Sequence, residues 1–375
     1  MNIQHFFAYS YEYTYFYTQF YTYYSLNILD FVLYREYYII KYFVGKVKIM
    51  NRAELVFKAI DVLAEKPQNA VRYPRIIRVQ NIAYHTASEE YNVADLYFRR
   101  DIFDDGKKHP ILLYVHGGGF IKGDKDYRIT NSEFYAHHGY FVFNIDYRMP
   151  PEVELEENFA DIVKAFNYIE TLSRYCNIDT DKIVVSGDSS GAYFSAMLCA
   201  FANNNELRER FRLPKLKYKP AAVALMCGLF DMDKVVTTPN VMGLVSKTMS
   251  MVLGINIKKD YSNTDEYEHI DFISPINYVD ENWCPTFITW AEEDILCIDQ
   301  GKPMADKLAE NGIKYKKFVV DGILNNHCYH LNMGFKTAKR CMNKCIHFLN
   351  EVLDVEDNTA DEIEEDEKGI KDEKK

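Results

Sequence analysis

The chain has 375 residues, of which 48% are hydrophobic and 26% are charged, and its formal net charge is −11 at pH 7. These values are typical of a soluble globular protein with room for one large domain plus an insertion, or for two domains of ordinary size. The sequence contains no basic patch that would indicate a nucleic-acid partner. The eight cysteines show no C-x-x-C spacing and follow no secretory signal, so we expect reduced thiols and a cytoplasmic location.

Residues 1–49 are crowded with tyrosine and phenylalanine, and they lack the positive start and the cleavage site of a signal peptide. Charged residues interrupt their most apolar part, 26–44, so we expect no stable membrane insertion. Two interpretations stay open. The stretch is an aromatic helical arm over a substrate cleft or a membrane surface, or translation begins at Met50, where an amphipathic helix opens. We favour the second.

From Met50 onward, strand and helix patterns follow one another. Apolar spacing predicts a helix over 52–65, and two alternating runs, 75–84 and 92–99, predict an antiparallel hairpin. The remaining predicted elements are strand 111–115, helix 131–138, strand 141–145, helix 159–172, a strand, turn and helix over 182–197, strand 221–227, strand 286–290, helix 300–311, strand 314–320 and helix 337–352. Apolar strands that alternate with helices predict an α/β fold with a mostly parallel central sheet and helices on both faces.

Two segments depart from this alternation. Residues 231–280 contain methionines and small residues at loose helical spacing, which is typical either of a lid or cap or of a helical excursion that packs on the core. Residues 354–375 contain eleven acidic and four basic residues, so we expect this tail to be disordered and solvated.

A G-x-S-x-G turn places Ser189 between a β-branched run and a stretch of small residues with helical spacing. A serine in such a strained turn projects its hydroxyl beyond the sheet edge, beside a helix N-terminus that favours negative charge. By itself the pattern is also compatible with an idle serine in a glycine-rich turn. If Ser189 is a nucleophile, the chain should also contain an oxyanion hole, an acid and a histidine, in that order.

All three parts have candidates. Residues 116–120 (HGGGF) directly follow a predicted strand, and the backbone N–H groups of Gly117, Gly118 and Ser190 are the predicted oxyanion donors. Asp294 is the preferred acid because Ile295 and Leu296 could pack and lock its position; Glu292 and Glu293 are the alternatives. The loop after strand 314–320 offers His327 and His330, of which we prefer His327. A metal site from these two histidines lacks a third ligand with recognisable spacing.

With these residues identified, the chain resembles the hormone-sensitive-lipase-like branch of the α/β-hydrolases over about residues 111–334. HGGGF matches the oxyanion motif of that family, GDSSG at 187–191 is similar to its GDSAG, and DYRMPPE at 146–152 is similar to its DYRLAPE. AEEDIL fits the acid motif and maps the acid to Asp294, and the His327-Cys-Tyr sequence is similar to His-Gly-Phe, which supports His327. The resemblance implies an α/β-hydrolase domain over 50–353, with a small helical cap from about 50–75 and 231–280.

The residues and the resemblance together predict a serine hydrolase that cleaves carboxylic esters of short to medium acyl chains through an acyl-enzyme, with no metal and no organic cofactor. Two alternatives stay open: an amide or N-formyl hydrolase or deacetylase with the same machinery, and a non-catalytic ligand-binding protein on the same scaffold. The expected partner is a small-molecule ester. The sequence leaves a homodimer open.

Overall fold

The computed structural model describes residues 65–237, 244–258, 260–322 and 325–356. All of them belong to one compact unit, Phe57–Lys375. The predictions for residues 1–49, for a start at Met50, for most of the helix over 52–65 and for nearly all of the acidic tail lie outside the described residues.

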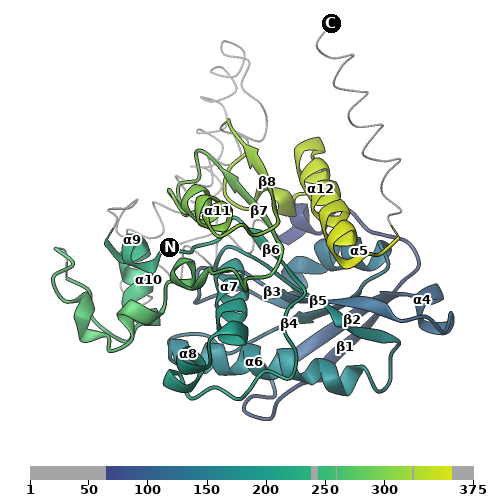
Figure 1. Ribbon diagram of the computed structural model, residues 1–375, viewed down its shortest axis with the longest axis horizontal. Coiled ribbons are helices and arrows are strands. Elements are labelled where there is room, and N and C mark those ends of the chain that lie inside the picture. The colour runs from purple at the N-terminus through teal and green to yellow at the C-terminus, as the bar shows by residue number, and fades with distance from the viewer. Residues whose placement is uncertain (1–64, 238–243, 259, 323–324, 357–375) are drawn as a thin grey trace, which may run out of the picture. The chain divides into compact units, whose positions relative to one another are not determined.

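An eight-stranded sheet organises the fold, in the order β1-β2-β4-β3-β5-β6-β7-β8 (Figure 1). β1 pairs antiparallel with β2 and β2 with β4, and every other neighbouring pair is parallel. The predicted hairpin and the predicted mostly parallel α/β sheet are therefore confirmed. The strands are β1 Ile76–Ala83, β2 Val93–Arg99, β3 His109–Val115, β4 Phe141–Ile145, β5 Ile178–Asp188, β6 Ala222–Met226, β7 Thr286–Ala291 and β8 Tyr315–Val320.

Helices cover both faces of this sheet, which is why its inner strands can be apolar along their whole length. On one face, α5 (Ile129–His137) and α12 (Lys336–Leu353) pack on side chains such as Leu112 and Val184 to form the main core. On the other face lie α6 (Leu155–Leu172), α7 (Ser190–Asn203) and α8 (Asn205–Arg210), while α11 (Gly301–Glu310) packs on β7 and β8. The short α4 (Arg100–Asp104) follows β2.

Most predicted elements end within one or two residues of the observed ones, and the differences have local causes. Helix α6 begins at Leu155, four residues before its prediction, because Glu154 and Glu157 form a reciprocal capping box at its N-terminus. The sequence did not predict the five-residue α4 or the six-residue α8, which are too short to show a helical period.

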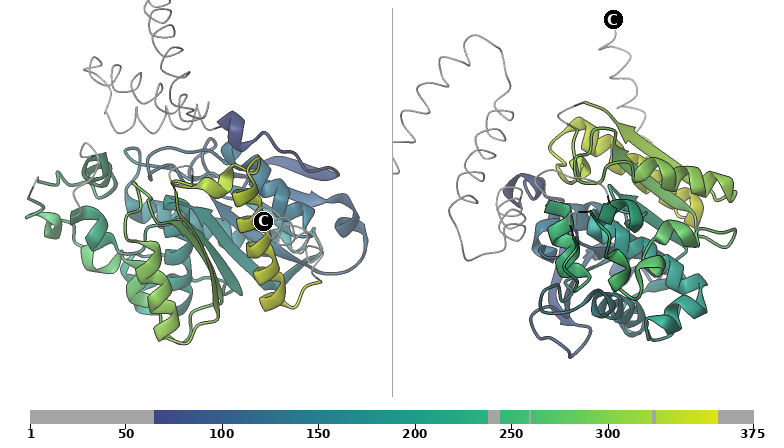
Figure 2. Two further views of the ribbon diagram at one scale, coloured as in Figure 1. Left: turned by 90° about the horizontal axis from the view of Figure 1, so that it is seen from above. Right: turned by 90° about the vertical axis from the view of Figure 1, so that its left-hand side faces the viewer.

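Among its described residues, the segment predicted as a cap or a helical excursion contains two helices, α9 (Met232–Thr237) and α10 (Leu244–Val252), and short 3₁₀ turns. Figures 1 and 2 show both helices in green, set apart from the helices that cover the sheet. The Gln300 side chain accepts hydrogen bonds from the N–H groups of Phe230 (2.8 Å) and Asp231 (2.9 Å), which ties the start of the segment to the beginning of α11. No helix in the described part of the chain has both the length and the apolarity to cross a membrane.

Candidate active site

The turn between β5 and α7 holds Ser189 in a strained backbone conformation with positive φ, at φ 53° and ψ −120°. A Cβ on Gly187 would lie 2.4 Å from the carbonyl carbon of Gly191, and a Cβ on Gly191 would lie 2.0 Å from the carbonyl oxygen of Val115. Only glycine fits at either position, and the resulting sharp turn places the Ser189 hydroxyl at the carboxyl edge of the sheet.

Three side chains from separate loops form one hydrogen-bonded chain at this edge. His327 Nε2 lies 2.9 Å from Ser189 Oγ, and His327 Nδ1 lies 2.7 Å from Asp294 Oδ2. Asp294 follows β7 and His327 follows β8, so the parallel strands bring residues far apart in sequence to the same edge. The structure therefore brings together the serine, the acid and the histidine that the sequence analysis preferred.

The alternatives lie outside this chain of hydrogen bonds. His330 is fully buried, and neither of its ring nitrogens hydrogen bonds to Ser189 or Asp294. Glu292 and Glu293 are exposed on the loop after β7. Neither glutamate is held against the imidazole as Asp294 is.

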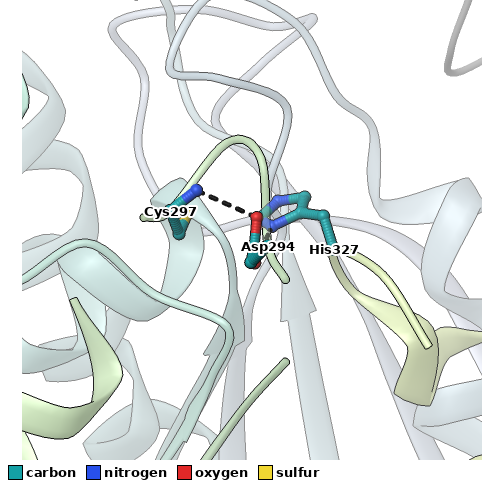
Figure 3. Close-up of side chains that lie close together, drawn as sticks. All are labelled: Asp294, Cys297 and His327. Carbon is teal, nitrogen blue, oxygen red and sulfur yellow. Dashed lines mark hydrogen bonds and ion pairs between the residues drawn. The ribbon is translucent and has the colours of Figure 1, made fainter. Parts of the chain in front are cut away.

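Backbone N–H groups hold Asp294 in place. Its Oδ1 accepts hydrogen bonds from the N–H of Leu296 and the N–H of Cys297, both at 2.9 Å, and Figure 3 shows the second of these bonds. The prediction that Ile295 would pack against the acid is wrong, because its side chain is 51% exposed. The loop folds so that its N–H groups, not its apolar side chains, orient the carboxylate.

The charges of the acid and the base stabilise each other. Burial by itself lowers the pKa of the His327 imidazole, but the adjacent Asp294 carboxylate, together with the Cys297 side chain, outweighs burial and raises that pKa well above its usual value. Burial raises the pKa of Asp294, yet the His327 ring and the two backbone N–H groups outweigh it and lower that pKa. The arrangement therefore favours a cationic imidazole, the species that forms when His327 accepts a proton.

The glycine loop after β3 lies against the serine turn, because Val115 pairs with Gly187 in the parallel ladder. Gly118 has φ +140°, and a Cβ there would lie 1.7 Å from the Lys122 carbonyl oxygen. A side chain at this position would clash with the backbone. The loop therefore needs glycine at position 118 in order to fold back on itself this tightly.

The prediction that Gly117 donates to an oxyanion needs correction. Its N–H already donates to Asp188 Oδ2 at 3.2 Å in a buried position, so it is not free for a substrate oxygen. The N–H groups of Gly118 and Ser190 make no hydrogen bond to other described residues. Ser190 also begins α7, where the unpaired N–H groups of the helix favour an anion.

A buried ion pair that the sequence did not predict lies beneath the serine turn. Arg128 donates from Nε and Nη2 to the two carboxylate oxygens of Asp188, both at 2.7 Å, and Tyr114 adds a hydroxyl at 3.2 Å. Arg128 is 6% exposed and Asp188 is 1% exposed. Because Asp188 also holds the Gly117 N–H, this pair joins the serine turn to the glycine loop. Nothing in the sequence around Arg128 marks it for this role.

Comparison with known proteins identifies the family to which this chain is similar. The family model BD-FAE matches residues 95–308, more than half of the chain. A putative alpha/beta hydrolase, R526, of Acanthamoeba polyphaga mimivirus is 23% identical over 77% of this chain and 80% of its own length. Lipase 2 of Moraxella sp. (strain TA144) is 24% identical over 60% of this chain and 57% of its own length.

Solved structures show the same fold. The crystal structure of an inhibited esterase B from Lactobacillus rhamnosis superposes with a TM-score of 0.70, at 16% identity, over 80% of this chain and 95% of that one. At this level of identity the likeness extends to the fold, which is that of the α/β-hydrolases. Taken with the family match, it shows that this chain belongs to the BD-FAE family of esterase- and lipase-type α/β-hydrolases and is a carboxylic ester hydrolase by that membership.

Proposed function

We propose that this chain hydrolyses carboxylic esters of short to medium acyl chains through an acyl-enzyme intermediate formed on Ser189. The observation that carries the proposal is the continuous chain of hydrogen bonds from Ser189 through His327 to Asp294, at 2.9 and 2.7 Å. Both distances lie within the reach that proton transfer requires.

In the proposed mechanism, His327 Nε2 takes the proton of Ser189 as the hydroxyl attacks the ester carbonyl. Asp294 holds the imidazole in the tautomer that leaves Nε2 free and stabilises the cation that forms. His327 then gives its proton to the departing alkoxide, and an ester bond to Ser189 remains. Water, activated by the same imidazole, attacks this ester and releases the acid.

The N–H groups of Gly118 and Ser190 are the proposed donors to the oxyanion. Both are free of other partners among the described residues, and the second lies at the N-terminus of α7. Gly117 is not among the proposed donors, because its N–H already donates to Asp188.

The preference for short to medium acyl chains rests on an apolar surface beside the acid. Ile295 and Ile298 are 51% and 44% exposed, and they line one hollow with Leu229 and Val235, the latter from α9. The hollow itself holds only about 20 Å³ and also includes Lys234, so these side chains offer a short apolar rim and not a preformed channel for a long acyl chain. Esterase B has been solved with a tributyrin phosphonate, described in that structure's name as a C4-C4 compound.

The same proposal includes the finer features that the sequence indicated. These are membership of the hormone-sensitive-lipase-like branch, a cap formed by about 50–75 and 231–280, and a cytoplasmic location with reduced thiols. The eight cysteines are all free in the structure, which is compatible with such thiols.

Activity-based labelling tests the proposal. A fluorophosphonate probe should attach to Ser189, and Ser189→Ala should lose labelling and about 10⁴-fold or more in kcat. Ser195→Ala is the matched control, because Ser195 lies in the same helix and its hydroxyl only donates to the Gly191 carbonyl, at 2.8 Å. Among p-nitrophenyl esters, butyrate and hexanoate should give a higher kcat/KM than laurate. Undiminished hydrolysis by Ser189→Ala would refute the mechanism.

A further inference from the structure

A thiol lies beside the acid and the base, and the proposed mechanism does not use it. One ligand atom each from Asp294, Cys297 and His327 lie within 4.8 Å of one another, and Figure 3 shows the three side chains converging from two loops. Cys297 is 7% exposed and Asp294 is 4% exposed, so their atoms are largely shielded from water. No sequence motif marks Cys297, because its relation to His327 exists only across two loops.

These three groups are a chemically coherent set of metal ligands. A thiolate, an imidazole nitrogen and a carboxylate oxygen are the ligands that Zn²⁺ takes in proteins, at about 2.0–2.3 Å and in tetrahedral geometry. Calcium and magnesium prefer oxygen ligands and would not select the thiol.

The distances require only small movements. Ligand atoms around a tetrahedral zinc ion lie about 3.3–3.8 Å apart, as follows from those bond lengths. One ligand atom of each residue already lies within 4.8 Å of the other two. In the proposed site, the pair formed by His327 Nδ1 and Asp294 Oδ2, now 2.7 Å apart, must open by about 0.6 Å. Asp294 keeps its orientation, because Oδ1 and not Oδ2 accepts the two backbone N–H bonds.

We propose that Asp294, Cys297 and His327 form an inhibitory site for a zinc-like divalent cation, with water in the fourth position. The cation takes the place of the proton between Asp294 and His327, and Cys297 binds as the thiolate after releasing its proton to solvent. No bond is oxidised or reduced.

Binding at this site explains inhibition through the tautomer of the imidazole. A cation on Nδ1 leaves the ring proton only Nε2, the nitrogen that faces Ser189 Oγ at 2.9 Å. A protonated Nε2 cannot accept the serine proton, so attack on the ester stops. This inhibitory effect rests on the proposed function, whereas binding of the cation does not.

Calorimetric titration of the full chain with ZnCl₂ tests binding separately from hydrolysis. In a Ser189→Ala background, one zinc ion should bind, and adding Cys297→Ser or Cys297→Ala should weaken that binding by about 100-fold or more, because a direct ligand contributes at least as much as an outer-sphere partner. Cys176→Ser is the matched control, because Cys176 is a half-buried thiol outside this cluster, and it should bind zinc as the background does. Thermal unfolding of each variant reports whether it folds.

Inhibition is measured on the chain with Ser189 intact. Zinc should suppress both p-nitrophenyl butyrate hydrolysis and fluorophosphonate labelling at least tenfold, and EDTA should restore both. Unchanged zinc affinity in both folded Cys297 variants would overturn the site. Binding that depends on Cys297 but leaves labelling of Ser189 unchanged would overturn the inhibitory role. If the chain hydrolysed no ester, the calorimetric result would still decide whether the site exists.

Discussion

Arg128→Ala should destabilise the protein strongly, because it leaves a buried charge without its partner. Arg128 makes two hydrogen bonds of 2.7 Å to Asp188, and both side chains are almost fully buried. Removing one member of such a pair typically costs 3–5 kcal/mol, since the remaining charge is neither solvated nor compensated. We therefore expect the free energy of unfolding to fall by about 3–5 kcal/mol near pH 8.

The loss should depend on pH in a defined direction. In the intact chain, burial raises the pKa of Asp188, but the adjacent Arg128 outweighs burial and lowers it. The ion pair therefore stabilises the fold fully above the pKa of an unfolded aspartate, about 3.9. That stabilisation is lost as pH falls through the lower pKa of Asp188 in the folded state. Without Arg128, burial dominates and raises the pKa of Asp188. An acid with a raised pKa destabilises the fold increasingly as pH rises, by at most about 1.4 kcal/mol per pH unit. The deficit should therefore be larger at pH 8 than at pH 5.

Urea unfolding followed by tryptophan fluorescence measures this deficit, because Trp283 and Trp290, the two tryptophans of the chain, are both buried. Arg174→Ala is the matched control. Its side chain is 66% exposed and lies 3.6 Å from Glu170, so its loss should cost less than about 1 kcal/mol.

A double variant, Arg128→Met with Asp188→Asn, removes both charges and should recover part of the lost stability. Three results would each contradict the reasoning: a deficit for Arg128→Ala below about 1 kcal/mol, a deficit that does not change between pH 5 and pH 8, or a double variant no more stable than the single one.

Three further predictions concern the active site and the core. Asp294→Asn should lower kcat by about 10⁴-fold, measured with p-nitrophenyl butyrate, because the amide favours the wrong imidazole tautomer; a loss below tenfold would argue against Asp294 as the acid. Gly118→Ala should abolish activity, since its Cβ would lie 1.7 Å from the Lys122 carbonyl oxygen. Gly139→Ala is the control: Gly139 has φ +91° and open space around it, so the variant should keep the rate and lose about 1 kcal/mol of stability. Equal activity in the two variants would contradict this prediction. Phe159→Ala should destabilise the fold by about 3–5 kcal/mol in urea unfolding, because this 1% exposed ring packs among four other aromatic rings; a change below about 1 kcal/mol would mean that the cluster repacks.

Elements with a local signal were predicted well. The apolar runs at 111–115, 141–145 and 286–290 correspond to β3, β4 and β7 with small differences at their ends. The serine turn was also predicted from the sequence. Glycine is required at 187 and 191 because a Cβ at either position would clash with near neighbours in sequence or with one adjacent strand. In both cases the pattern that carries the information spans only a few residues.

The candidate site was predicted in part. Ser189, Asp294 and His327 each follow a strand, and motif order suggested their roles, but the sequence alone left His330 and two glutamates as alternatives. The distances of 2.9 and 2.7 Å select one histidine and one acid. The order of the strands, with β4 between β2 and β3, likewise depends on pairing between segments far apart in the chain.

What the sequence by itself determined is where most strands lie along the chain and which turn carries the serine, because backbone propensity, periodicity and steric limits act over a few neighbouring residues. What only the tertiary structure decided is which groups meet: the N–H of Gly117 with Asp188, the guanidinium of Arg128 beneath the serine, and the thiol of Cys297 beside His327. These contacts join loops that are distant in sequence, and their distances depend on how the parallel strands and helices pack, so no local pattern encodes them.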